Sequence, residues 1–430
     1  MKPYSTNQIF VPGGLPELTY VARTEQDLEV RLRQVRDNLC KLVTLTGPTK
    51  CGKTVLAHRE FPREKVVWLD GGVFSDEVGL WLEVNTQLNQ PTAVTTSSAS
   101  TPTSKMGGEI GGAIGLGGTQ LQGKFSLAQE SQHSTSTAQM RFGDPKAVAV
   151  AALRTSRTPL VIDDFHYLPR SLQESVIRAL KPLIFHGVPV VVLAIPHRRY
   201  DAIRVEREMT GRVENVQVPA WDESELAEIA RVGFPLLGMD VSDATIADLA
   251  SEALGSPHLM QEFCRQLCRN LGVDKTVASH LRVPAGAADK SLFKNVAAAT
   301  GRTMFERLKR GPRMRSDRIS RKLSSGEETD IYGVVLRGLA SLRPGIQTVA
   351  YEELRGAIRQ VCAEQPPQAH EVSRVLEKMA EISSSDEAST PVIDWDKDNN
   401  LLHITDPFFA YYLRWGEIDL SDGSLRLGYA

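Results

Sequence analysis

The stretch Lys41-Leu-Val-Thr-Leu-Thr46, followed directly by Gly47-Pro-Thr-Lys-Cys-Gly-Lys-Thr54, decides the fold. The first six residues are an apolar, β-branched run typical of a buried strand, and the next eight match G-x-x-x-x-G-K-[ST]. A helical pattern continues over 54–59. A glycine-containing loop between a strand and a helix N-terminus turns backbone N–H groups toward a phosphate. The sequence therefore predicts a phosphate-binding loop in which Lys53 reaches the β- and γ-phosphates and the Thr54 hydroxyl binds Mg²⁺.

A second motif, Pro159-Leu-Val-Ile-Asp-Asp164, supplies carboxylates for the same site. A buried strand ending in Asp163 would carry that side chain to the carboxyl edge of the sheet, where it can hold the Mg²⁺ shell. Asp164 is predicted to orient the attacking water; the alternative is a solvated helix cap. Together, the two motifs predict binding of ATP or GTP.

Further apolar runs extend the prediction to a whole domain. They cover 65–70, 160–162 and 188–195, and they are continuous rather than alternating. Continuous runs separated by helical patterns indicate parallel strands covered on both faces. The expected fold class is α/β, a P-loop NTPase parallel sheet with a helical lid and a C-terminal winged-helix domain. The expected boundaries are an N-terminal segment at 1–19, the α/β domain at 20–220, the lid at 221–300, a basic linker at 301–328 and the winged helix at 329–430.

Composition excludes several classes of protein. The chain has 430 residues with 50 Lys+Arg against 52 Asp+Glu, so its formal charge of −2 gives no global attraction to nucleic acid or anionic membranes. Five scattered cysteines indicate free thiols in a reducing compartment. No leader pattern and no run of 18 apolar residues is found, so a cytoplasmic protein without a membrane span is expected.

A glycine-rich insertion interrupts the α/β domain at about 91–135. Within it, a two-residue turn at Gly117-Gly118 would place Ile114 opposite Leu121 and Ile110 opposite Phe125. The prediction is a projecting β-hairpin; the alternative is a flexible linker.

The C-terminal part is predicted to form helices at 329–342, 351–364 and 369–382 and strands at 391–395 and 401–405, which is a winged-helix pattern. The third helix carries Arg374 and Lys378 against three glutamates, and the turn between the strands is acidic. Carboxylates facing phosphates are unfavourable, so a packing or protein-contact role is favoured over DNA binding. Nucleic acid, if bound, is expected at the basic stretch 302–322.

A family resemblance can be stated from these residues. Tyr20-Val-Ala-Arg23, with Glu25 and Leu28, resembles the FxGRexEL opening of STAND and AAA-type ATPases, although Ala22 replaces the glycine. The Asp163-Asp164 ending is also similar to that of STAND proteins. The resemblance implies that the opening segment lies against adenine. The residues it implies for the nucleotide are Tyr20, Val21, Arg23, Gly47, Pro48, Thr49, Lys50, Cys51, Gly52, Lys53, Thr54 and Val55.

Shorter matches imply further site residues. Gly255-Ser-Pro257 is similar to the GxP motif that touches nucleotide in STAND proteins. Arg198, with His197 second, stands where these families carry a sensor residue. Arg207 and Arg212 stand where AAA+ proteins place an arginine finger; a surface salt bridge is the alternative for either.

The function expected is that of an ATP-binding, Mg²⁺-dependent ATPase that forms a homo-oligomer and works as a switch or motor on a protein partner carrying the effector. The STAND resemblance implies a role in bacterial signalling or defence. One alternative is a DNA-binding loader or regulator similar to initiator or transposition ATPases. Another is a nucleotide-binding scaffold with little turnover.

Overall fold

The structure is a computed structural model, and it describes residues 3–37, 40–90, 144–195, 211–312, 319–345, 348–384 and 391–420. Several predictions fall outside these ranges. They are the glycine-rich hairpin, the sensor candidates Arg198 and His197, the finger candidate Arg207, and residues 313–318 of the basic stretch.

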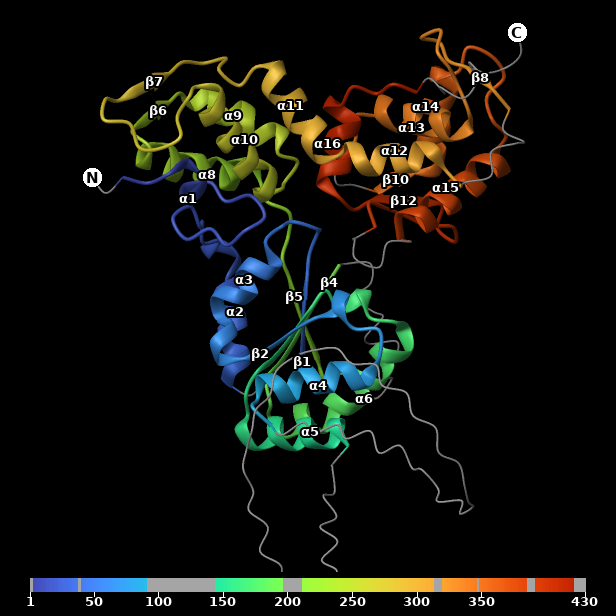
Figure 1. The fold of residues 1–430 in the computed structure, drawn as a ribbon. Helices are drawn as coiled ribbons and strands as arrows, with labels where there is room; N and C mark the ends of the chain where they lie inside the picture. Colours follow the sequence, from blue (N-terminus) through green and yellow to red (C-terminus); the bar gives the residue numbers. More distant parts are fainter. Residues whose placement is uncertain are drawn as a thin grey trace, which may run out of the picture.

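In the described residues, five parallel strands form the central sheet (Figure 1), in the order β2-β3-β4-β1-β5. They are β1 (Leu42–Thr46), β2 (Val67–Asp70), β3 (Leu160–Asp163), β4 (Val190–Ala194) and β5 (Val213–Gln217). All carboxyl ends therefore lie at one edge. The phosphate loop leaves that edge from β1, and the Asp163-Asp164 pair leaves it from β3.

Helices cover both faces of the sheet, as the continuous apolar runs predict. Val43 and Leu45 pack with side chains of α2 (Leu28–Gln34) and α3 (Lys53–Glu60). Leu42 packs on the opposite face with side chains of α4 (Glu77–Gln87), α5 (Pro145–Ser156) and α6 (Arg170–Phe185). The strands carry mostly apolar side chains, with Thr44 of β1 donating to Asn215 of β5 at 3.0 Å, and the charged side chains of the two motifs lie at the carboxyl edge.

The lid consists of α8 (Glu223–Leu236), α9 (Asp243–Glu252), α10 (Pro257–Asn270) and α11 (Lys290–Thr300), with a small parallel pair β6 (Met239–Val241) and β7 (Leu281–Val283). The N-terminal segment packs on this lid through α1 (Thr6–Ile9). The Thr6 hydroxyl donates to the Val273 carbonyl at 2.7 Å, and the ring centroids of Phe10 and Phe234 are 5.1 Å apart. The start of the chain is therefore part of the lid.

The C-terminal domain has the three helices and two strands expected from the sequence, with a further short strand between the first two helices that was not predicted. Its helices are α13 (Ile331–Ser341), α14 (Tyr351–Val361) and α15 (Ala369–Ser384), and its antiparallel strands run in the order β10 (Thr348–Ala350), β12 (Leu401–Ile404), β11 (Ile393–Asp396). Where the sequence analysis predicts a linker, the structure has helix α12 (Arg302–Arg310) and the short strands β8 (Arg321–Lys322) and β9 (Glu328–Thr329). Phe305 and Leu308 of α12 are fully buried, and this burial makes the helix part of the domain.

The last described helix, α16 (Pro407–Trp415), lies between the lid and the C-terminal domain and shares a core with both (Figure 1). The Tyr411 hydroxyl donates to the Phe293 carbonyl at 2.9 Å, and the Tyr411 ring lies 5.1 Å from that of Phe263. The Trp415 indole donates to Glu252 of α9 at 2.7 Å. Lid and C-terminal domain are thus packed as one body. Among the described residues, no helix is both long and apolar enough to span a membrane.

The contact between α16 and the start of α12 leaves no space for a side chain at Gly301. A Cβ there would lie 2.4 Å from Tyr412 Cβ and 2.5 Å from the Phe408 carbonyl oxygen. We expect Gly301→Ala to lower the free energy of unfolding by about 2 kcal/mol, because backbone must move to accommodate the methyl group. Gly356→Ala, where nothing lies within 4 Å, should instead raise it by about 0.5–1 kcal/mol. Urea unfolding of both variants checks this; equal stabilities would contradict the tight contact.

Candidate nucleotide site

The phosphate loop owes its shape to two glycines and one lysine. A Cβ at Gly47 would lie 2.4 Å from the Val218 carbonyl oxygen, so only glycine fits there. Gly52 has φ +94° and Lys50 has φ +59°, both in the left-handed region. These turns bring the chain round into α3, which begins at Lys53.

The Lys53 side chain is buried and folds back over the loop. Its Nζ donates to the Gly47 carbonyl at 2.9 Å and to the Pro48 carbonyl at 2.8 Å. A buried ammonium is stable only when it is hydrogen-bonded or paired with a negative charge. The loop therefore holds a desolvated cation at the position where the motif requires one.

Three carboxylates lie opposite this cation at the ends of β2 and β3. Asp70 pairs in register with Asp163. The Thr54 side chain hydrogen-bonds Asp163, whose Oδ1 also accepts the Asp164 backbone N–H at 3.0 Å. Burial raises the pKa of Asp163 above its usual value, although these two hydrogen bonds act to lower it. Burial and the adjacent Asp163 charge raise the pKa of Asp164 to about 6.

The donor set around Thr54 fits Mg²⁺. This ion prefers oxygen ligands, keeps several waters, and is bound by one or two carboxylates together with substrate phosphates. Thr54 and Asp163 supply a hydroxyl and a carboxylate that are already hydrogen-bonded to each other. The charge of Asp70 raises the pKa of both Asp163 and Asp164, so the three carboxylates lie close together. Among the described residues no cluster of three or more protein ligands forms a complete metal site. The substrate's phosphates would therefore have to complete the shell.

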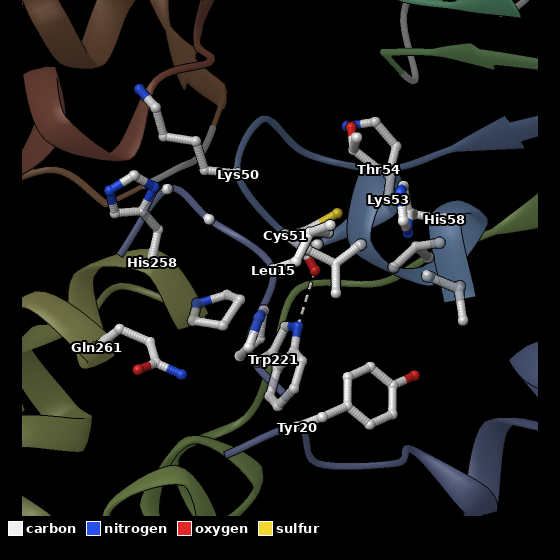
Figure 2. A pocket seen from close by; sticks show the side chains of 18 of the residues that line it. Leu15, Tyr20, Lys50, Cys51, Lys53, Thr54, His58, Trp221, His258 and Gln261 are labelled. Carbon is white, nitrogen blue, oxygen red and sulfur yellow. Dashed lines mark hydrogen bonds between the residues drawn. The ribbon is translucent and has the colours of Figure 1, made fainter. Parts of the chain in front are cut away.

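A cavity of about 690 Å³ opens beside the phosphate loop (Figure 2). Its volume lies within the range of small-molecule sites. Three parts of the chain form its walls: the α/β domain, the N-terminal segment from Val11 to Arg23, and the lid. Of the residues named from the sequence, Tyr20, Val21, Arg23, Thr49, Lys50, Cys51, Gly52, Lys53, Thr54, Val55, Asp164 and Pro257 line it.

Trp221 closes the cavity at the junction of sheet and lid, and sequence analysis missed it. Its indole N–H donates to the Cys51 carbonyl at 2.9 Å, which joins the phosphate loop to the lid (Figure 2). Its backbone N–H donates to the Gly255 carbonyl at 3.3 Å. Tyr20, whose hydroxyl donates to Glu29 at 2.7 Å, also lines this part of the cavity. Together they give the cavity aromatic surface of the kind on which a base can stack.

Arg23 is buried, and its guanidinium holds the hinge of the lid. Its Nε and Nη2 donate to the Glu225 carboxylate, both at 2.9 Å. Its Nη1 donates to the Pro219 carbonyl at 2.9 Å, and Nη2 also donates to the Ala220 carbonyl at 3.1 Å. The guanidinium also lies 5.0 Å from the Trp221 ring centroid. Arg23 thus lines the cavity while its polar groups are committed to protein acceptors.

Gln261 of α10 connects the lid to the N-terminal segment at the cavity wall. Its Oε1 accepts the Val11 backbone N–H at 3.0 Å, and its Nε2 donates to the Thr19 hydroxyl at 2.9 Å. Pro257 and His258, at the start of the same helix, also face the cavity. Burial and the charge of Lys50 lower the pKa of His258 to about 4, so this ring is neutral at pH 7.

Arg212 lies away from this site. It precedes β5, at the amino edge of the sheet, and its guanidinium lies 5.7 Å from the ring of Phe185 at the end of α6. The phosphate loop leaves the opposite edge. Arg212 therefore cannot reach the phosphates bound by its own chain.

No family model and no curated protein matches the sequence. Solved structures similar to this chain are found, at TM-scores below 0.5. The Walker-type ATPase of Pyrococcus abyssi is 15% identical, with 92% of this chain and 99% of that chain covered at a TM-score of 0.49. Drosophila ORC bound to DNA is 11% identical, with 95% and 89% covered at 0.39.

A STAND protein with a tetratricopeptide repeat sensor, from Pyrococcus horikoshii, is 13% identical, with 93% of this chain and 43% of that chain covered at a TM-score of 0.36. These three structures are thus described as a Walker-type ATPase, an ORC assembly and a STAND protein, each at an identity of 15% or less and a TM-score below 0.5.

The raised pKa of Asp164 predicts how stability depends on pH. The folded state holds this proton up to about pH 6 and the unfolded state only to about 3.8, so stability falls as pH rises through this window. In protein free of metal and nucleotide, Asp164→Asn should therefore be more stable than the unaltered chain at pH 7.5, by on the order of 2 kcal/mol.

Urea unfolding at pH 4 and pH 7.5 measures this difference. Asp248→Asn, on the exposed side of α9, is the control and should leave the pH dependence unchanged. If Asp164→Asn shows the same pH dependence as the unaltered chain, the carboxyl is not buried as described.

Proposed function

We propose that this protein binds ATP and hydrolyses it with Mg²⁺, and that nucleotide occupancy acts as a switch on a protein partner. One observation carries the proposal. Lys53, Thr54 and the Asp163-Asp164 pair, which are far apart in the sequence, meet beside a cavity large enough for a nucleotide.

Each side chain has a separate role. Lys53 exchanges the loop carbonyls for phosphate oxygens and neutralises the charge that develops there during transfer. Thr54 and Asp163 hold Mg²⁺, which when bound neutralises phosphate charge. Asp164 hydrogen-bonds the attacking water. With a pKa of about 6, its carboxyl is ionised at pH 7 yet basic enough to accept a proton.

The walls of the cavity support a switch rather than a simple hydrolase. The N-terminal segment and the lid contribute surface to the same cavity. Trp221 joins the lid to the phosphate loop, and Arg23 of the N-terminal segment lies 5.0 Å from the Trp221 ring. A ligand that contacts several bodies at once stabilises one arrangement of them over another. The output would pass to a partner protein through the body formed by the lid and C-terminal domain, and the active form would be a homo-oligomer.

A DNA-binding loader or regulator is the second candidate. The C-terminal domain gives it limited support, because Lys378 of α15 is paired with Glu381 at 2.5 Å, and Lys397 of the wing is paired with Glu377 at 2.7 Å. Paired lysines release few counterions from DNA. ATPase rates with and without duplex DNA separate the two candidates, since stimulation by DNA would favour the loader. A burst of one turnover or less would favour a nucleotide-binding scaffold.

Lys53→Ala should abolish ATP hydrolysis, with a loss of at least about 100-fold, because the phosphates lose their buried cation. Asp163→Asn should lower the Mg²⁺-dependent rate more than it lowers nucleotide affinity. Single-turnover rates and calorimetric affinities measure both. Lys65→Ala removes an exposed lysine outside the cavity and should retain the unaltered rate. If Lys53→Ala hydrolyses ATP like the unaltered chain, the site is wrongly assigned.

Arg212→Ala should retain ATP affinity and lose hydrolysis, because an arginine at the amino edge of the sheet can act only on a neighbouring subunit's nucleotide. Mixing Arg212→Ala with excess Lys53→Ala should restore part of the rate, since each variant supplies what the other lacks. The mixing assay is read together with the particle mass. Failure to restore any activity, with monomers at every concentration, would exclude shared sites.

A further inference from the structure

The phosphate loop touches the C-terminal domain directly through Lys50. Its Nζ forms an ion pair with Asp406 and lies 3.8 Å above the centre of the Phe408 ring. Asp406 precedes α16, 356 positions along the chain from Lys50. Figure 2 shows the Lys50 side chain pointing away from Lys53 and Thr54 and toward the C-terminal domain.

This contact is largely desolvated on the acidic side. The Asp406 side chain is 7% exposed and that of Lys50 is 27% exposed. A carboxylate with so little water depends on its partners. Among the described residues, Asp406 pairs with Lys50 and accepts the Phe409 backbone N–H at 2.9 Å at the start of α16. The Phe408 ring that lies under Lys50 packs edge-on against His258 of the lid, with centroids 4.7 Å apart. Phosphate loop, lid and C-terminal domain thus meet around one ammonium group.

We propose that the Lys50–Asp406 pair is a latch that positions the phosphate loop and competes with the nucleotide for Lys50. Asp406 is a positioning residue in this scheme: it acts on the substrate only through Lys50. The competition for Lys50 rests on the proposed binding of ATP. The positioning of the phosphate loop by the C-terminal domain does not depend on that proposal.

Charge decides the direction of the effect. A bound triphosphate places several negative charges beside the loop, where Asp406 adds one more of the same sign. Lys50 can neutralise the phosphates only to the extent that its ion pair with Asp406 is broken. Formation of the Lys50–Asp406 pair and binding of nucleotide therefore oppose each other. Because α16 is built into the core of lid and C-terminal domain, release of Asp406 removes the contact of the C-terminal domain with the phosphate loop, while Trp221 still joins the lid to the Cys51 carbonyl.

Asp406→Asn isolates the charge. Asparagine caps a helix as well as aspartate does, so α16 keeps its start while the ion pair is lost. We expect about fivefold tighter binding of a non-hydrolysable ATP analogue with Mg²⁺ by calorimetry, and about fivefold faster hydrogen exchange of the amides of 49–52 without nucleotide. Glu327→Gln, which breaks a 2.6 Å pair with Arg337 inside the C-terminal domain, is the matched control and should change neither quantity.

A double-mutant cycle ties the effect to this pair. Lys50→Asn removes the cation with a residue that tolerates the left-handed backbone. In that background Asp406→Asn should change neither exchange nor affinity further. If Asp406→Asn fails to fold, as judged by circular dichroism, Phe408→Ala serves as the second variant and should speed exchange in the same amides.

The outcomes are distinct. Tighter binding together with faster exchange, both absent in the Lys50→Asn background, supports the latch. If Asp406→Asn speeds exchange but neither the variant nor the unaltered chain binds nucleotide, the proposed function is wrong. The positioning of the phosphate loop by Asp406 is then still supported. Unchanged exchange, weaker nucleotide binding, or an equal effect of Asp406→Asn with and without Lys50 overturns the latch.

Discussion

The fold depends on a parallel sheet buried on both faces. Such a sheet buries mostly apolar side chains along its strands and leaves the charged side chains of the two motifs at the carboxyl edge, where the chain leaves for the next helix. Lys53 and Asp163 are brought to that edge by β1 and β3, which are separated in the sheet by β4. Buried there with little water, the opposite charges depend on one another, and this mutual dependence makes the edge responsive to an added polyanion.

The second constraint is the continuous core of lid and C-terminal domain. Aromatic side chains of α10, α11 and α16 interlock, with Phe263, Phe293 and Tyr411 in contact. Interiors packed in this way move as units rather than deforming gradually. A displacement at the phosphate loop would therefore be transmitted to the far end of the C-terminal domain as a rigid rotation, without needing a separate pathway of side chains.

Local patterns allowed the elements of the α/β domain to be predicted closely. The strand expected at 41–46 is β1 at Leu42–Thr46, and the strand ending in the Asp pair is β3. These predictions held because a buried strand and a glycine-containing loop are specified by neighbouring residues. Strand β10 has only three residues, Thr348–Ala350, and is defined by its pairing with β12. Nothing local marks it.

The walls of the cavity were predictable only in part, for the same reason. Trp221, Gln261 and His258 reach the site because the lid folds over the sheet, and such contacts join residues up to hundreds of positions apart. The available signal was position: Trp221 lies four residues after the end of β5, just before the first helix of the lid. The ion pair between Arg23 and Glu225 could not be predicted either, because the two residues are 202 positions apart in the sequence.

The distance in sequence between Lys50 and Asp406 also orders events during synthesis. A ribosome adding about 5–20 residues per second needs roughly 20–70 s to pass from one to the other. The sheet and its phosphate loop can form during that interval, while α16 has not yet been made. The nascent chain thus has its phosphate loop before it has the helix that contacts Lys50. Under the proposed function, nucleotide would reach the loop first, and the C-terminal domain would dock on a site already exposed to it.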